Sequence, residues 1–145
     1  MGLDCYIYAV PKYEDNPDVV DCTKDIEAPF LVKDVDGFTS MPFYEDMVYW
    51  RKNWVVERFC NKLYFKKAYL NKLDVDDDFN CCYVKLEPKD IEALIEEVKE
   101  IPLEDWRDET IEDDKYDTLE KLTVFLSKMK NPMYKGMDFY FTPWW

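Results

Sequence analysis

The stretch LDCYIYAV, which runs from Leu3 to Val10, decides the fold class of this chain. Apolar and polar side chains alternate along it, which is the pattern of a β-strand with one buried face. One face would carry Leu3, Cys5, Ile7 and Ala9, and the other would carry Asp4, Tyr6, Tyr8 and Val10. The pattern stops at Pro11. We therefore expect this segment to be a strand of a sheet.

The next segment, from Pro11 to Pro42, holds four of the eight prolines and many acidic side chains. This composition predicts a long irregular connection. The dipeptide Asp36-Gly37 favours a tight turn, so a short hairpin is expected there.

A helix is predicted from about Glu45 to Tyr69. Acidic residues at its start and lysines in its later turns suit the helix dipole. Its buried stripe would contain Val48, Val55, Phe59, Cys60 and Leu63, with Trp50 and Trp54 packed against the core.

Two strands and two helices are predicted in the rest of the chain. The strands run from Cys81 to Leu86 and from Met137 to Thr142. One helix begins at Glu87, ends at Pro102, and would bury Ile91, Leu94, Ile95 and Val98. An acidic connection, Leu103 to Asp113, leads to a helix from Tyr116 to Lys130, which would bury Leu119, Leu122, Thr123, Leu126 and Met129. This order predicts an α+β fold, in which a small, mostly antiparallel sheet packs against about three helices.

The composition fits a single globular domain, residues 1–145. Apolar residues make up 48% and aromatic residues 17% of the chain, which is enough for a packed core. No run of about 18 apolar residues occurs, and the first residues lack a secretion signal, so neither a membrane span nor export is expected. Five cysteines without CxxC spacing indicate reduced thiols in a cytoplasmic protein.

The sequence contains no histidine, which removes the commonest general base and the usual mixed zinc ligands. The acidic run Asp74 to Asn80 fails as a calcium loop, because Phe79 stands at the glycine position and Lys85 at the final glutamate position. No phosphate-binding glycine motif occurs. We therefore expect no catalytic residues, no metal site and no cofactor.

Charge is distributed very unevenly along the chain. The segment Glu87 to Glu120 has fifteen acidic residues against four basic ones, whereas Arg51 to Lys72 has seven basic residues against one acid. The net charge of −13 opposes direct nucleic-acid binding, so the basic segment is interpreted as neutralising the acidic helix within the fold.

The acidic segment has two interpretations, a solvated helical face or a docking surface for a basic groove, including mimicry of a nucleic-acid backbone. The docking residues would be Glu92, Glu96, Glu97, Glu100, Glu104, Asp105, Asp108, Glu109, Glu112, Asp113 and Asp114. A second hypothesis places an anionic ligand, such as a nucleotide, in an aromatic pocket formed by Trp50, Arg51 and Lys52.

Four segments resemble a family of small uncharacterised tailed-bacteriophage proteins. They are MGLDCYIYA at residues 1–9, VYWRK at 48–52, NCCY at 80–83, and DFY at 138–140 before a tryptophan end. Family members open with MGLDMYLY and carry the YWRK segment at the start of a helix. This chain departs from the family at Glu57, where relatives often have histidine, and at Cys82 and its neighbour, which replace a Gly-Glu pair.

The resemblance implies a phage origin and a location in the host cytoplasm, but no established activity. A phosphoglycerate kinase label on some relatives does not suit a chain of 145 residues without phosphate-binding loops. The function expected is that of a non-enzymatic accessory protein that binds a host protein with a basic groove, as an inhibitor of a defence or nucleic-acid-handling complex. A ligand-sequestering protein and a virion or assembly component remain alternatives, and a homo-oligomer is compatible with the sequence.

Overall fold

The computed structural model describes residues 2–21, 28–37, 39–109 and 114–145. They form a five-stranded antiparallel sheet in the order β2-β6-β7-β1-β5, with a separate two-stranded hairpin. The sheet strands are β1 (Asp4–Pro11), β2 (Val19–Val20), β5 (Glu45–Arg51), β6 (Tyr83–Leu86) and β7 (Met137–Trp144). The hairpin consists of β3 (Val32–Lys33) and β4 (Thr39–Ser40).

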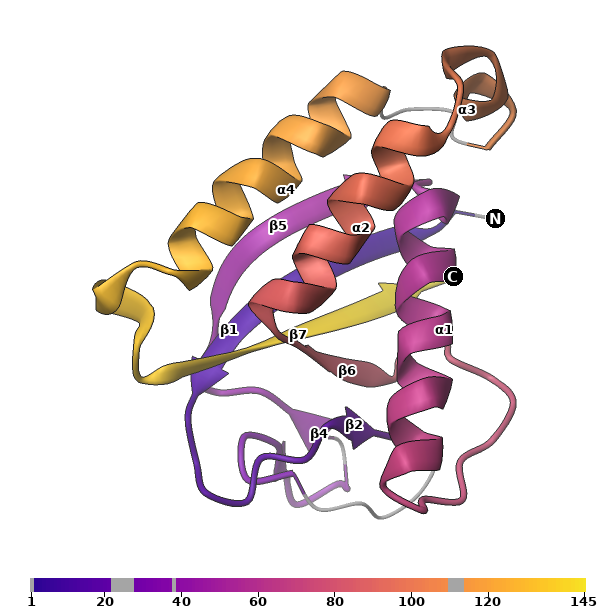
Figure 1. Cartoon of the computed structure of the whole chain (residues 1–145). Coiled ribbons are helices and arrows are strands. Elements are labelled where there is room, and N and C mark those ends of the chain that lie inside the picture. Colours follow the sequence, from indigo (N-terminus) through magenta and orange to yellow (C-terminus); the bar gives the residue numbers. More distant parts are fainter. Residues whose placement is uncertain (1, 22–27, 38, 110–113) are drawn as a thin grey trace.

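The helices lie over one face of this sheet (Figure 1). They are α1 (Trp54–Leu70), α2 (Pro88–Glu100), α3 (Leu103–Glu109) and α4 (Lys115–Met129), and a 3₁₀ turn, η1 (Pro132–Tyr134), precedes β7. The α+β prediction is confirmed. In the described ranges, no helix combines the length and the apolar character that a bilayer crossing requires.

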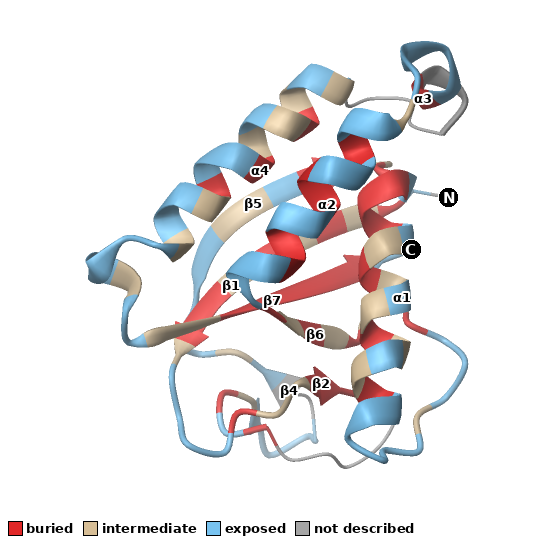
Figure 2. Ribbon diagram, viewed as in Figure 1, coloured by how far each residue is buried: buried red, intermediate tan, exposed pale blue. Residues whose placement is uncertain are grey.

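The main core lies between the sheet and the helices. Leu3, Cys5, Ile7 and Ala9 are all buried, so the predicted face of β1 is confirmed. Figure 2 shows buried residues along β1 and β7 and on the inner sides of α1, α2 and α4. The helical contributions include Val56, Cys60 and Tyr64 from α1, Ile91, Leu94 and Val98 from α2, and Leu122 and Phe125 from α4. Each fully buried apolar side chain of this size contributes about 1.5–3 kcal/mol to stability.

A second, smaller core lies on the other face of β1 and β7. It joins Val10, Val20, Ala28, Phe30 and Tyr140, so the long connection is partly packed against the sheet. The Tyr140 hydroxyl donates a hydrogen bond to the Pro17 carbonyl. The predicted hairpin is confirmed, because β3 pairs with β4 around Gly37, whose φ of 83° suits a turn glycine.

The predicted helix from Glu45 to Tyr69 is wrong over its first third. Residues Glu45–Arg51 form β5, which pairs with β1, and the helix begins only at Trp54. Asn53 sets this start, because its side-chain oxygen accepts a hydrogen bond from the Val56 amide at 3.1 Å. Lys52 has a φ of 54°, which separates the strand from the helix.

Two smaller expectations in the carboxyl-terminal half also change. Part of the predicted acidic connection is helical, because α3 spans Leu103–Glu109 around the buried Trp106. Residues 110–113 of that connection lie outside the described ranges. In α4, Thr123 was predicted to be buried but is exposed, and its hydroxyl donates a hydrogen bond to the Leu119 carbonyl. Phe125 is buried instead.

Candidate functional site

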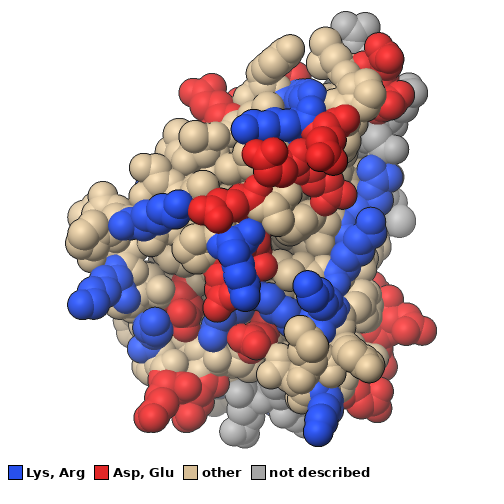
Figure 3. All heavy atoms as spheres, in the orientation of Figure 1, with Lys and Arg blue, Asp and Glu red and all other residues tan. Residues whose placement is uncertain are grey.

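The acidic surface consists of the exposed carboxylates of α2 and α3. Its members with described side chains are Glu92, Glu96, Glu97, Glu100, Glu104 and Asp105. Figure 3 shows acidic side chains gathered over α2, beside a line of basic side chains along α1. The exposed acids of α2 lie on the side of the helix opposite its buried apolar stripe, because polar and apolar residues recur in its sequence with the period of a helix.

The remaining predicted docking residues are spread more widely. Asp114 is the N-cap of α4, where its carboxylate accepts a hydrogen bond from the Asp117 amide at 2.6 Å. Asp108 and Glu109 lie in α3, but the structure does not describe their side chains. Glu112 and Asp113 lie outside the described residues.

Some acidic side chains of α2 are already paired with lysines. Glu92 lies 2.9 Å from Lys130, and Glu96 lies 3.3 Å from Lys99. Within the described part of the chain, Glu97 and Glu100 have no ion-pair partner. A single ion pair in that part joins α1 to α2, and it is the partly buried contact between Lys67 and Asp90 at 3.1 Å. The acidic surface therefore keeps carboxylates available for a partner.

The residues of the predicted ligand pocket do not come together. Trp50 is fully buried on the helix side of β5, whereas Arg51 is exposed and, by strand alternation, points to the opposite face. Lys52 lies in the turn before α1. These three side chains therefore do not form the predicted pocket.

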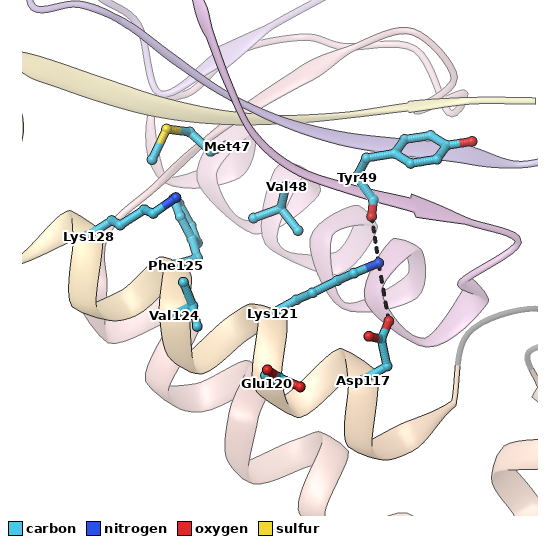
Figure 4. Close-up of a pocket in the computed structure, with 9 residues that line it drawn as sticks. All are labelled: Met47, Val48, Tyr49, Asp117, Glu120, Lys121, Val124, Phe125 and Lys128. Carbon is cyan, nitrogen blue, oxygen red and sulfur yellow. Dashed lines mark hydrogen bonds and ion pairs between the residues drawn. The ribbon is translucent and has the colours of Figure 1, made fainter.

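A different hollow lies between β5 and α4, and we call it the β5–α4 groove (Figure 4). Its volume is about 450 Å³. It is lined by Met47, Val48, Tyr49, Asp117, Glu120, Lys121, Val124, Phe125 and Lys128. The groove therefore has an apolar centre and charged residues along the helix.

Strand β5 forms one wall of the β5–α4 groove. It is the last strand of the sheet, so one of its edges pairs with β1 and the other faces the groove. The backbone amide of Lys52 donates a hydrogen bond to the Leu3 carbonyl of the neighbouring strand. In an antiparallel pair only every second residue bonds its neighbour in this way, so Tyr49, three residues earlier, directs its backbone N–H and C=O groups away from β1. The register skips Met47, which forms a bulge between Asp46 and Val48.

Helix α4 forms the other wall and is held by buried contacts. Thr118 accepts a hydrogen bond from Asn53 at 3.0 Å, and Leu122 and Phe125 enter the core. Lys121 reaches across the groove, where its Nζ donates to the Tyr49 carbonyl at 3.0 Å and lies 3.2 Å from Asp117. Val124, which is 49% exposed, forms an apolar point on the rim.

The side chain of Tyr49 points away from α4 (Figure 4) and, by strand alternation with Trp50, lies on the face of the sheet opposite the helices. Its hydroxyl donates to Asp4 at 2.6 Å, and this hydrogen bond is the main reason why the pKa of Tyr49 rises to about 12. The phenol therefore stays protonated at neutral pH and anchors β5 to β1.

Burial also affects the titratable side chains of the core. Cys60 is fully enclosed, and burial raises the pKa of its thiol. No disulfide joins any of the four cysteines in the described ranges. In all the parts of the chain that the structure describes, no three acidic or cysteine side chains lie close enough together to hold a metal ion.

Glu57 is a buried acid in the first turn of α1, only 4% exposed. Burial raises its pKa, although a hydrogen bond from Asn61 and the charge of Arg58 act in the opposite direction. A raised pKa in the folded state means that stability is lost as the pH rises through the unfolded pKa toward the folded one.

The variant Glu57→Gln is therefore expected to be more stable than the wild type at pH 7. It keeps an oxygen for Asn61 but has no charge to desolvate. The two proteins should converge at about pH 3, below the unfolded pKa of about 4.3, where Glu57 is protonated in both states. Melting temperatures at both pH values measure this effect, with the exposed Glu97→Gln as control, and equal curves at pH 7 would contradict it.

Comparison with known proteins finds no matching family model, no matching curated relative and no matching solved structure.

Proposed function

We propose that this chain is a non-enzymatic phage accessory protein that binds a cationic host macromolecule through its acidic surface. The phage origin and the host-cytoplasmic location follow from the sequence resemblance. The partner would be a host protein with a basic groove, such as a component of a defence or nucleic-acid-handling complex. In that role the chain would act as an inhibitor that takes the place of a nucleic-acid backbone.

The observation that carries this proposal is the display of carboxylates on the outer side of α2. Glu97 and Glu100 are exposed and have no ion-pair partner in the described residues, while the opposite side of α2 holds the core. A rigid row of such charges attracts a Lys/Arg cluster and speeds association, and salt weakens it.

The test is capture of a partner from host lysate by tagged protein. The variant Glu96→Lys, Glu97→Lys, Glu100→Lys and Asp105→Lys is expected to lose at least about 90% of the capture, because attraction becomes repulsion across the interface. Wild-type capture should fall as salt rises from about 50 to 200 mM. Quantitative mass spectrometry of the eluate measures both effects.

A matched control reverses four exposed acids elsewhere in the chain, with Glu14→Lys, Asp15→Lys, Asp36→Lys and Asp77→Lys. It changes the net charge by the same amount and should retain capture. If the control loses the partner equally, net charge and not the acidic surface determines binding, and the proposal fails.

A further inference from the structure

The free edge of β5 offers backbone groups to a further strand. Tyr49 directs its N–H and C=O groups toward the β5–α4 groove, and its carbonyl already accepts a hydrogen bond from Lys121. Extended peptides bind proteins by adding a strand to such an edge, with side-chain pockets at alternate positions giving specificity.

The side of α4 that lines the groove has a spacing that matches a strand. Glu120, Val124 and Lys128 all line the groove and follow one another at intervals of four residues. Four residues of a helix rise about 6 Å, and two residues of an antiparallel strand rise about 6.8 Å. Every second side chain of an added strand would therefore meet one of these three residues.

The direction of α4 fixes the order of these contacts. Lys121 contacts Tyr49, whereas Tyr134, just after the helix, bonds Glu45, so α4 runs antiparallel to β5. A strand added antiparallel to β5 runs in the same direction as α4. It would meet Glu120 first, then Val124, then Lys128.

The row of Glu120, Val124 and Lys128 has a charged side chain at each end that is available to bind a ligand. Glu120 and Lys128 are exposed, and neither has an ion-pair partner among the residues that the structure describes. Between them, Val124 and the apolar side chains of Met47, Val48 and Phe125 surround the centre of the groove. Complementary side chains would be basic opposite Glu120, apolar at the centre and acidic opposite Lys128.

We propose that the β5–α4 groove binds an extended segment of a partner protein, which adds as an antiparallel strand to β5. The segment has a basic, an apolar and an acidic residue at alternate positions, in that order. This site lies apart from the acidic surface and does not depend on the function proposed above. Lys121 covers the Tyr49 carbonyl when the groove is empty, and the added strand displaces it.

Two fluorescein-labelled peptides test this proposal, acetyl-TRTLTET-amide and its charge-swapped counterpart acetyl-TETLTRT-amide. Fluorescence anisotropy at about 50 mM salt is expected to show about tenfold tighter binding of the first peptide, because two modest ion pairs become two repulsions in the second. Equal affinity for the two peptides would overturn the proposal.

The protein variant Glu120→Lys with Lys128→Glu supplies the decisive comparison. Both positions are exposed and unpaired in the described structure, so the fold should be retained, which circular dichroism checks. This variant is expected to reverse the preference and bind the charge-swapped peptide more tightly. An unchanged preference would show that these residues do not contact the peptide.

A second readout separates strand addition from simple charge attraction. Hydrogen exchange at the Tyr49 amide should slow at least about tenfold when the first peptide is bound, because that N–H becomes part of a ladder. The variant Lys121→Met, which uncovers the Tyr49 carbonyl, is expected to bind the peptide several-fold more tightly. Unchanged exchange, or weaker binding by this variant, would contradict strand addition.

The acidic-surface variant with four lysine substitutions should bind the first peptide like the wild type. A result in which it loses the lysate partner but keeps the peptide supports two separate sites. If it loses the peptide as well, the peptide binds the acidic surface and the groove proposal is overturned.

Discussion

Replacing Asp90 by alanine is expected to lower the free energy of unfolding by about 3–5 kcal/mol, because it leaves the largely enclosed ammonium group of Lys67 without its ion-pair partner. Asp90 lies 3.1 Å from Lys67, and the two side chains are only 9% and 12% exposed. The same carboxylate accepts a hydrogen bond from the Glu87 amide at 2.8 Å at the start of α2. The substitution therefore removes an ion pair and a helix cap together. Urea denaturation followed by tryptophan fluorescence measures the loss.

A matched control lies on the same helix. Glu92 is paired with Lys130 at 2.9 Å, but both side chains are more than half exposed, so Glu92→Ala should cost less than about 1 kcal/mol. The double variant Lys67→Met with Asp90→Asn removes both charges and should recover much of the stability. If Asp90→Ala costs no more than Glu92→Ala, the pair does not hold α1 against α2.

The sequence was sufficient to predict elements whose apolar period is regular. Strand β1 alternates from Asp4 to Ala9, and α2 has Ile91, Leu94, Ile95 and Val98 on one stripe between a proline start and a proline end. Both elements are observed almost as predicted. Periodicity works here because each element has one face in the core and one face toward polar surroundings.

Strand β5 was assigned to a helix because local preference does not distinguish the two structures in this segment. Val48 and the residues near it fit a helical stripe with Val55 and Phe59, yet Val48 pairs with Ile7 in the sheet. The pairing partner lies about forty residues away in the sequence, and no local pattern reveals such a contact. Tertiary pairing with β1 therefore overrides the helical pattern.

The position of the β5–α4 groove depends on the same tertiary arrangement. The sequence shows Glu120, Val124 and Lys128 as ordinary exposed helix positions, and it does not show which strand is the edge of the sheet. The acidic surface was easier to predict, since a local excess of acids on the polar side of α2 is visible directly. Its role as a docking surface is a separate proposal.

Trp50 gives the second large expected effect. The variant Trp50→Ala should lower the free energy of unfolding by about 3–5 kcal/mol, because it leaves a cavity where an indole is fully buried. This loss is a large fraction of the roughly 5–15 kcal/mol that stabilises a typical domain. Thermal and urea denaturation would both register the change.

Two other substitutions separate core packing from any role of Trp50 in binding. Trp54 is 36% exposed, so Trp54→Ala should cost much less than Trp50→Ala. The Trp50 Nε1 atom is buried and has no hydrogen-bond partner in the described structure, and an unsatisfied donor costs about 1–3 kcal/mol. Trp50→Phe removes this donor and leaves only a small cavity, so it should retain most of the stability. A Trp50→Ala protein as stable as the wild type would contradict the core role, because a side chain enclosed by β1, β5 and the helices cannot be removed without loss of packing.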